Sequence, residues 1–514
     1  MSQMTGILDP ERESSALNII KNKRLTFMQQ VLELYKLGED TVGPVTVNDE
    51  LRKAMDEGVI CDLWEGNAPF RPRYVIPDYS VLFKKGCEFL ELGIPEDLQE
   101  ACNSLLILYR HIPSSGGYPV YLGQLDELLE PYVLKEERSR AKRTLQLFLK
   151  HIDKAIPDSF VHVDIGPYDT QTARLILECT EEMQLAVPNI TLKYDPEKTS
   201  DEFAALCAKC MLKTAKPSFA NDVMISKEWG QDYAVASCLN LLKIAGGGYT
   251  LARIKLHDAA KLAKNIEDFK ENILPYYMRL LLEFIDRRIT FMSEESVFFQ
   301  TNFLVKEGFI DQEKFTGMVG VVGLAECVNH LLNISDPKKG FGNNKSADDL
   351  GVEICELMDK MVKDHPGVHC SKVGGVYGMH AQVGISDDGR SNTPGTRIPI
   401  GAEPELSKHL AHSARFHKYF PTGAGDIFTF ENTWQKTPEA LIDIIKGSFA
   451  MGVRYFSGYT ADSDVVRVTG YLVKKSELAK LDRGEQVLNG ATVLGKGQRD
   501  GAHALNRKIE EYTE

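Results

Sequence analysis

Short apolar runs alternate with helical stretches along most of this chain, and this alternation is the feature that most limits its fold. The runs at 160–163, 190–192 and 252–256 are short and apolar, as expected of buried strands. Strands that alternate with helices predict an α/β protein. Because no internal repeat, low-complexity tract or Pro/Ser-rich linker interrupts the chain, we expect residues 1–514 to form a single unit.

Two of the helices can be given predicted boundaries. Over residues 17–34, apolar residues recur three or four residues apart, or at twice that spacing. This pattern predicts an amphipathic helix, which Gly38 can end. A later helix is predicted to begin at Ser346, whose hydroxyl can cap it, and to stop before Pro366. Its apolar face is formed by Leu350, Ile354, Leu357 and Met361. The glycine-rich stretch 367–401 is predicted to form loops over the scaffold, where functional groups often lie.

Charge and hydropathy argue against several classes of protein. The net charge of −13 and the pI near 5.5 disfavour nucleic-acid binding, which needs a basic surface. No apolar run approaches the roughly 18 residues that a membrane helix requires. The N-terminus has no basic segment that leads into an apolar one, so we expect a cytoplasmic protein.

The ten cysteines are scattered through the chain, which fits a reducing compartment better than a disulfide scaffold. Cys207 and Cys210 form the one C-x-x-C pair, and no second pair follows at the spacing of a zinc or iron–sulfur site. Both lie in a helix-like run from Phe203 to Lys213. We therefore interpret them as small packing residues and predict no metal site.

Two segments that are remote in sequence are the strongest functional candidates. The first is 467–471, Arg-Val-Thr-Gly-Tyr, and the second is 232–240, Asp-Tyr-Ala-Val-Ala-Ser-Cys-Leu-Asn, which leads into a glycine-rich turn and a strand. Three more segments accompany them: 73–78 (Arg-Tyr-Val-Ile-Pro-Asp), 187–191 (Val-Pro-Asn-Ile-Thr) and 217–222 (Pro-Ser-Phe-Ala-Asn-Asp). In this order the five segments resemble the fingerprints of the glycyl radical enzymes. The YjjI family of these enzymes is similar along nearly the whole chain.

The resemblance implies one large α/β barrel of ten strands with helices outside, in which a glycine loop and a cysteine loop meet at the centre. It implies a stable radical on the backbone of Gly470 and a thiyl radical at Cys238. A separate radical SAM activating enzyme, with an iron–sulfur cluster and S-adenosylmethionine, would install the radical, so no bound cofactor is expected. Roughly residues 390–514 would form a C-terminal glycine radical region within the barrel.

The residue types at these two positions suit that chemistry. A backbone radical is stabilised when it is planar and conjugated with both flanking amides, and glycine has no side chain to crowd it. The Cys238 thiol can give a hydrogen atom to the Gly470 radical, and the thiyl can then abstract hydrogen from a substrate carbon. Because a hydrogen atom moves only over very short distances, we expect Gly470 and Cys238 to be close in space. The surrounding interior must also exclude water and oxygen.

The neighbours of Cys238 limit the reaction. Pyruvate formate-lyases have two adjacent cysteines in this loop, whereas Ser237 precedes Cys238 here, so an acyl-enzyme on a first sulfur is not available. Diol dehydratases of this superfamily have a glutamate two residues after the cysteine. Asn240 stands at that position and can form hydrogen bonds but cannot take a proton. A base would have to come from elsewhere, with four candidates: His257, His369, His380 and Asp222.

Other candidate site residues have supporting roles. Arg467 and Tyr471 are expected to position the glycine loop, and Asn240 to support the cysteine. The glycine-rich loops offer His380, Gln382 and Arg397 as substrate-binding candidates. Arg397 can pair with a carboxylate or phosphate of the substrate, or it can hold a loop carbonyl or an acidic neighbour, and the second role is preferred.

The favoured hypothesis is an anaerobic enzyme that acts on a small polar metabolite by hydrogen abstraction, with lyase-type cleavage of a C–O or C–C bond. Ribonucleotide reduction is an alternative, because Arg-Val-Thr-Gly-Tyr-Leu also resembles anaerobic ribonucleotide reductase. No cysteine follows Cys370, however, so the zinc site of those reductases is not expected. A non-catalytic protein of the same fold, which binds or regulates a partner, is the third hypothesis. The substrate and a homodimer are left open.

Overall fold

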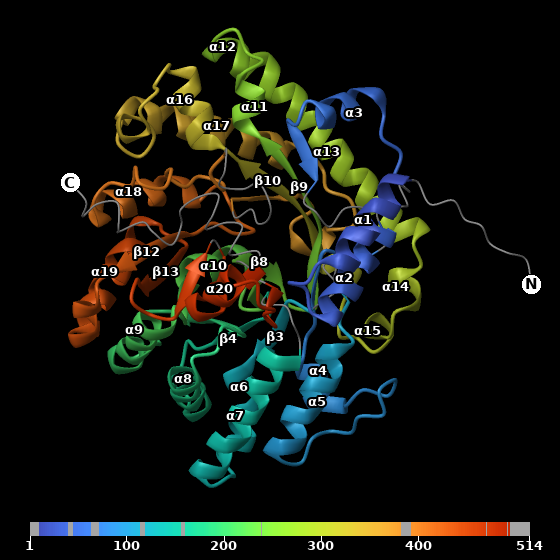
Figure 1. The fold of residues 1–514 in the computed structure, drawn as a ribbon, viewed down its shortest axis with the longest axis vertical. Helices are drawn as coiled ribbons and strands as arrows, with labels where there is room; N and C mark the ends of the chain where they lie inside the picture. Colours follow the sequence, from blue (N-terminus) through green and yellow to red (C-terminus); the bar gives the residue numbers. More distant parts are fainter. Residues whose placement is uncertain are drawn as a thin grey trace, which may run out of the picture.

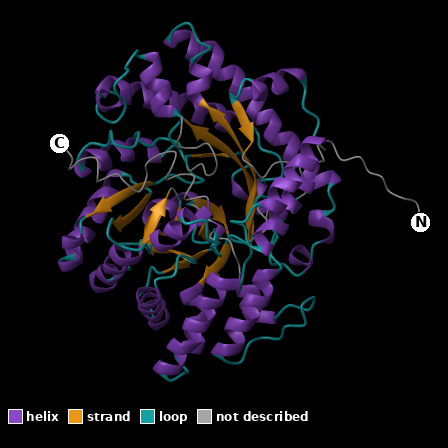
Figure 2. Ribbon diagram, in the orientation of Figure 1, coloured by secondary structure: helices purple, strands orange, loops and turns teal. Residues whose placement is uncertain are grey.

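In the part of the chain that the structure describes, the fold consists of two mixed β-sheets and two separate β-hairpins, with helices around the outside (Figures 1 and 2). The computed structural model describes residues 10–39, 45–62, 71–113, 119–155, 160–237, 239–381, 392–468, 470–490 and 492–493. Within those ranges, every helix is too short or too polar to span a bilayer.

The larger sheet has six strands in the order β12-β13-β6-β5-β4-β3. Its bounds are β3 (Tyr121–Gln124), β4 (His162–Ile165), β5 (Asn189–Tyr194), β6 (Ser218–Asn221), β12 (Asp426–Phe430) and β13 (Tyr455–Thr460). Strands β3 to β6 are parallel, and helices connect each of them to the next. Strand β13 runs antiparallel to β6 and parallel to β12.

The second sheet is centred on β9 (Gly246–Lys255) and β10 (Phe315–Val322), which are parallel. β1 (Ile60–Asp62) and β2 (Tyr74–Ile76) pair with β9 in antiparallel fashion, and β11 (Gly378–His380) pairs with β10 in parallel. The predicted strand at 252–256 is therefore the last part of a longer strand, and Leu256 already begins a helix.

Two hairpins carry the two segments that the sequence singled out. β7 (Tyr233–Ala236) pairs with β8 (Asn240–Lys243), and β14 (Val465–Val468) pairs with β15 (Tyr471–Lys474). In the described residues, the strands of each hairpin form a ladder only with one another.

The helices have the following bounds: α1 Pro10–Lys21, α2 Phe27–Glu39, α3 Asp49–Asp56, α4 Ser80–Lys85, α5 Leu98–Arg110, α6 Leu125–Val133, α7 Arg138–Ala155, α8 Gln171–Met183, α9 Asp201–Thr214, α10 Asp222–Trp229, α11 Leu256–Ala260, α12 Ile266–Asp268, α13 Leu274–Thr290, α14 Phe298–Thr301, α15 Phe303–Lys306, α16 Leu324–Leu331, α17 Lys345–Asp364, α18 Leu406–His417, α19 Pro438–Met451 and α20 Lys475–Asp482. Side-chain caps start several of them: Thr170 accepts from the Ala173 amide in α8, and Ser200 from that of Phe203 in α9.

Both helix boundaries expected from the sequence need correction. The amphipathic stretch 17–34 belongs to two helices, α1 and α2, and α2 continues through Gly38. Much of its apolar surface stays exposed, with Phe27 73% exposed and Ile20 55%. Helix α17 does end before Pro366, but its cap is Asn344, whose side chain accepts from the amides of Ser346 and Ala347. Asparagine caps as well as serine does, and it stands two residues earlier.

The glycines at 246–248 were expected to form a turn, which is wrong. The turn lies at Ile244 and Ala245, and the glycines begin β9. A Cβ at Gly246 would overlap the carbonyl oxygen of Lys314, and a Cβ at Gly247 that of Tyr74. The glycines are therefore needed because β2 and the residue just before β10 approach this part of β9 closely.

Strands β4 and β5 are buried on both faces, but the two faces differ in chemistry. Side chains of alternate residues point to opposite faces of a sheet. One face carries the apolar set Val163, Ile165, Ile190 and Leu192, and the other carries the polar set His162, Asp164, Asn189, Thr191 and Lys193. All nine are at most 3% exposed. Because buried polar groups need partners, the polar face must meet other polar groups inside the molecule.

The α/β class is confirmed. Ten strands closed into one barrel, with a radical region over about 390–514, remain predictions, since the described ladders form two separate mixed sheets. Cys207 and Cys210 are buried and free in α9, which agrees with their interpretation as packing residues.

Replacing Gly246 with alanine is expected to destabilise the protein by roughly 1–3 kcal/mol, because its Cβ would overlap backbone that cannot move freely. Gly38→Ala is the control, since it lies in a helix with open space around it and should stabilise by about 0.5–1 kcal/mol. Thermal unfolding of both variants measures the difference. Equal midpoints for the two would contradict the close approach of strands at β9.

Asp164 is expected to make stability depend on pH. Burial raises the pKa of its carboxyl to about 7, although Lys193, the Val235 amide and the Tyr121 hydroxyl oppose the rise. The unfolded value is about 3.9, so the stabilising contribution is complete below pH 4 and is lost as the pH rises through 7. Asp164→Asn should therefore gain stability relative to the wild type between pH 5 and pH 8. The exposed Asp364→Asn is the control, and thermal unfolding at several pH values should show a pH-dependent gap for Asp164→Asn only.

Candidate functional site

The outer edge of β7, in the β7–β8 hairpin, lies against the polar face of the larger sheet. Backbone groups two residues apart in a strand point to the same edge, and inside a protein they need hydrogen-bond partners. Three side chains of β4 and β5 supply them. Lys193 Nζ donates to the Tyr233 carbonyl at 2.7 Å, the Val235 amide donates to Asp164 Oδ2 at 2.9 Å, and His162 Nδ1 lies 2.6 Å from the Ser237 carbonyl oxygen.

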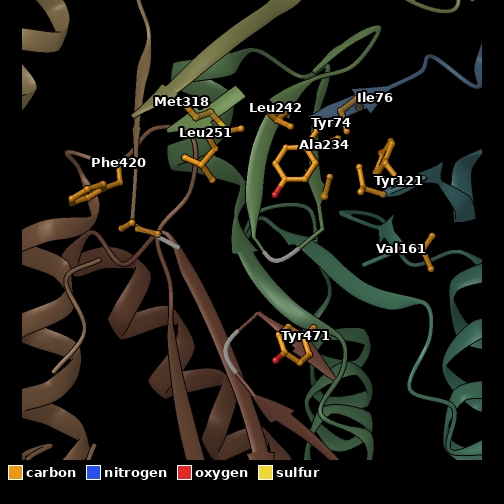
Figure 3. Close-up of a cluster of buried hydrophobic side chains, with 14 of the residues drawn as sticks. Tyr74, Ile76, Tyr121, Val161, Ala234, Leu242, Leu251, Met318, Phe420 and Tyr471 are labelled. Carbon is orange, nitrogen blue, oxygen red and sulfur yellow. The ribbon is translucent and has the colours of Figure 1, made fainter. Parts of the chain in front are cut away.

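The hairpin also separates two groups of apolar side chains. Ala234 and Leu242 on one face join a cluster with Tyr74 and Leu251 (Figure 3). Tyr233, Val235 and Leu241 on the other face pack with Tyr455. Apolar packing on both faces and polar side chains along the free edge therefore hold the hairpin inside the molecule.

Cys238 lies outside the described residues, but both of its neighbours are described. The pairing of Ala236 with Asn240 leaves a loop of three residues, 237–239. Ser237 has a φ of +50°, in the left-handed region that residues other than glycine rarely adopt. Ser237 is 3% exposed and Leu239 is 2% exposed. The loop that carries Cys238 thus begins and ends inside the protein. Its first residue, Ser237, has an unusual backbone conformation.

Gly470 is buried in the two-residue loop between β14 and β15. Its carbonyl oxygen accepts from Asn189 Nδ2 and from Arg467 Nη1, each at 3.3 Å. Arg467 Nη2 in turn donates to Asn189 Oδ1 and to the Ala215 carbonyl, both at 3.0 Å. The Tyr471 ring packs edge-on against Phe160 at 5.6 Å. Arg467 therefore holds the glycine loop onto β5.

The contacts of the two loops converge on neighbouring residues of one strand pair. His162, which meets the Ser237 carbonyl, faces Asn189 across the β4–β5 ladder. Asn189 in turn donates to the Gly470 carbonyl. Adjacent strands lie about 4.8 Å apart, so the flank of the cysteine loop and the radical glycine candidate are attached to side chains one strand spacing apart.

Burial sets the charge state of His162. Loss of solvent lowers the pKa of its imidazole to about 3, so the ring is neutral near pH 7. A carbonyl oxygen can only accept a hydrogen bond, so the neutral ring carries its proton on Nδ1. Nε2 is then unprotonated and is an acceptor. Nε2 lies 2.9 Å from the Thr191 hydroxyl, which is 2.8 Å from the Tyr455 hydroxyl. Thr191 therefore donates to His162 and accepts from Tyr455.

Asn240 is a buried amide next to the cysteine loop, 1% exposed. Its Nδ2 donates to the Ala236 carbonyl at 3.2 Å. Its Oδ1 has no hydrogen-bond partner within the described part of the chain. An acceptor that is buried and unsatisfied in a protein without bound ligand is a group that a ligand can satisfy.

The predicted substrate-binding residues contact the backbone of a neighbouring segment. His380 Nδ1 lies 3.0 Å from the Thr422 carbonyl, and Arg397 Nε donates to the Gly425 carbonyl at 3.1 Å. The same segment meets the cysteine hairpin, since the Thr422 carbonyl also accepts from the Leu241 amide at 2.9 Å. Arg397 thus makes the loop-carbonyl contact that the sequence analysis preferred. Gln382 lies outside the described residues.

The other three candidate bases contact side chains outside the two loops. Asp222 accepts a hydrogen bond from the Tyr233 hydroxyl of β7 at 2.7 Å. His369 is 27% exposed and lies 3.0 Å from Glu294. His257 lies in α11 with its ring 5.8 Å from that of His330.

His162, Asp164 and Lys193 were not predicted from the sequence as site residues, and Asn189 was given no role. The sequence did contain a signal for them, because polar residues occupy alternate positions of two apolar strands. These are His162 and Asp164 in the first strand and Asn189, Thr191 and Lys193 in the second. Such an alternation predicts one polar face on a strand that is otherwise buried.

Comparisons with known proteins identify the family. The family model described as "Glycyl radical enzyme YjjI-like" matches residues 25–510. A protein of Haemophilus influenzae is 44% identical over 500 residues, which cover 96% of this chain and 97% of the relative. The YjjI protein of Escherichia coli is 39% identical over 460 residues, which cover 89% and 88%.

Solved structures share the fold at low sequence identity. An anaerobic ribonucleotide reductase from Thermotoga maritima has a TM-score of 0.68 at 13% identity, over 92% of this chain and 89% of that one. Hydroxyproline dehydratase from Clostridioides difficile has a TM-score of 0.64 at 12% identity, over 94% and 88%. At this identity the likeness supports the fold alone. The match of the family model and the relatives over nearly the full length show that the chain belongs to the YjjI-like family of glycyl radical enzymes.

Proposed function

We propose that this protein is an anaerobic, cytoplasmic enzyme in which a radical stored on Gly470 passes to Cys238. The resulting thiyl radical abstracts a hydrogen atom from a small polar metabolite. The supporting observation is that the Gly470 carbonyl and the carbonyl directly before Cys238 are bound by side chains that face each other across one strand pair. Lyase-type cleavage of a C–O or C–C bond is the favoured reaction.

Activation needs a second protein. Glycyl radical enzymes receive their radical from a radical SAM activating enzyme, and that enzyme is the proposed partner here. Because Gly470 is buried, the β14–β15 hairpin must leave the interior for the activating enzyme to reach it. A bound cofactor in the chain itself is not part of the proposal.

Asn240 is proposed to bind substrate beside the thiyl radical. Its free Oδ1 can accept from a hydroxyl or amino group on the carbon next to the one that loses hydrogen. Such a hydrogen bond fits a polar metabolite. The Asn240 side chain would act there as an acceptor but not as a base. His380, Gln382 and Arg397 remain second-rank candidates for substrate contact.

Ribonucleotide reduction is the second candidate, since the fold is shared with anaerobic ribonucleotide reductases. Consumption of ribonucleotides by the activated protein would favour it over lyase chemistry. A non-catalytic role as a binding or regulatory partner is the third candidate, which the first experiment below tests.

Anaerobic activation with a radical SAM activating enzyme and S-adenosylmethionine is expected to give an organic radical in the electron paramagnetic resonance (EPR) spectrum. Exposure to air should then cut the backbone at Gly470 and release the fragment that ends at Glu514. Gly470→Ala should show neither result. Cys238→Ser should keep the radical but consume no metabolite in an anaerobic screen. A Cys238→Ser variant that retains the full cellular phenotype would favour the non-catalytic role.

Asn240→Leu is expected to lower the rate of radical-dependent metabolite consumption by roughly tenfold at low substrate, because one hydrogen bond to substrate is lost. Asn240→Asp should restore an acceptor and make that rate depend on pH. The radical content by EPR should match the wild type in both variants. An unchanged rate for Asn240→Leu at equal radical content would rule out substrate contact.

A further inference from the structure

We infer that Asn189 and His162 are positioning residues for the exchange of a hydrogen atom between Cys238 and Gly470. The inference deepens the proposed function and rests on it. Neither side chain gives or takes the hydrogen atom. Each holds the backbone of one loop, and the pair sets the separation of the loops.

The geometry gives each residue one loop to hold. Asn189 donates to the Gly470 carbonyl, and His162 meets the Ser237 carbonyl, so each contact lies on or next to a reacting residue. Asn189 is 1% exposed and His162 is fully buried. Their backbones are register partners in a ladder of parallel strands. A ladder between buried strands is among the least mobile parts of a fold, so the two loops share a rigid support.

Further hydrogen bonds fix the orientation of each side chain. Asn189 Oδ1 accepts from Arg467, which points Nδ2 toward the glycine carbonyl. On the other side, the Thr191 hydroxyl donates to His162 Nε2, which keeps the ring proton on Nδ1. The amide of Asn189 and the imidazole of His162 therefore each have one orientation that satisfies all their contacts.

Asn189 and Arg467 also act on the electronic structure of the radical. In a glycyl radical the unpaired electron spreads from Cα onto the carbonyl oxygen. Two donors on that oxygen, one of them on a guanidinium, draw electron density toward it. The donors therefore influence both the stability of the radical and the spin density that remains on Cα.

The step that these residues support is a balanced hydrogen-atom transfer. The S–H bond of Cys238 breaks and a Cα–H bond forms at Gly470, so the unpaired electron moves to sulfur. In the reverse step the Cα–H bond breaks and the thiol is restored. No further oxidant or reductant takes part. Since the thiol proton exchanges with water and the Cα hydrogen does not, repeated transfer in D₂O replaces the Gly470 hydrogen with deuterium.

This exchange gives a test that does not need the substrate. Activated full-length protein is transferred into anaerobic D₂O, and the EPR doublet from the Cα hydrogen is followed as it collapses. In Asn189→Asp the acceptor for Arg467 remains but the donor to Gly470 is lost. The collapse should slow by roughly ten- to a hundredfold, because small misplacements strongly affect such steps. The initial doublet splitting should also change, which loss of packing alone would not cause.

The His162 variants form a matched pair. Asparagine can place its amide N–H near the position of Nδ1, whereas glutamine reaches toward Nε2. His162→Gln should therefore slow the collapse, and His162→Asn should restore it toward the wild-type rate. Asn221→Asp is the control for loss of a buried amide, because Asn221 donates to the Phe449 and Val453 carbonyls and holds neither loop. The EPR doublet of Asn221→Asp should collapse at the wild-type rate.

The outcomes separate the two proposals. This inference is overturned if two results occur together: Asn189→Asp keeps the wild-type collapse rate and doublet splitting, and His162→Gln keeps the wild-type collapse rate. The proposed function would then remain in place. If Asn189→Asp does not take up the radical, the His162 pair decides. A wild-type protein that forms no radical, or a Cys238→Ser variant whose doublet collapses, refutes the proposed function itself.

Discussion

The structure around the site depends on the outer edge of β7 in the β7–β8 hairpin. A two-stranded hairpin inside a protein leaves the outer row of backbone groups of each strand without a ladder partner, and each unsatisfied group is costly. Lys193, Asp164 and His162 satisfy three of these groups from the facing sheet. The polar face of β4 and β5 is thereby explained: it replaces the strand that the hairpin lacks.

The same strands connect the hairpin to the rest of the fold. Their apolar face carries Val163 and Ile190, both fully buried on the side opposite the polar set. A displacement of β4 and β5 would therefore move both loops, since His162 and Asn189 contact them. The glycine hairpin depends on this support as well, since Arg467 binds Asn189 and the Ala215 carbonyl. Overall stability and the geometry of the site share one set of strands.

Much of this could be predicted from the sequence. Alternating apolar runs predict the α/β class, and the motifs at 232–240 and 467–471 predict the family. That each motif lies in a β-hairpin is known only from the structure. Local patterns failed where tertiary contacts decide. Gly246 reads as a turn residue, but the approach of Lys314 requires glycine within a strand. His162 reads as one polar residue in an apolar run, and its role follows only from Ser237, which is distant in sequence.

The hairpin that carries the cysteine loop is held against the larger sheet by side chains, without a backbone ladder between them. A ladder permits only discrete shifts of register, which turn every side chain to the opposite face. Side-chain anchors such as Lys193 allow gradual change, because a longer or shorter residue moves the loop by a fraction of a residue. A substitution at such an anchor therefore shifts the β7–β8 hairpin against the larger sheet without changing the pairing of any strand.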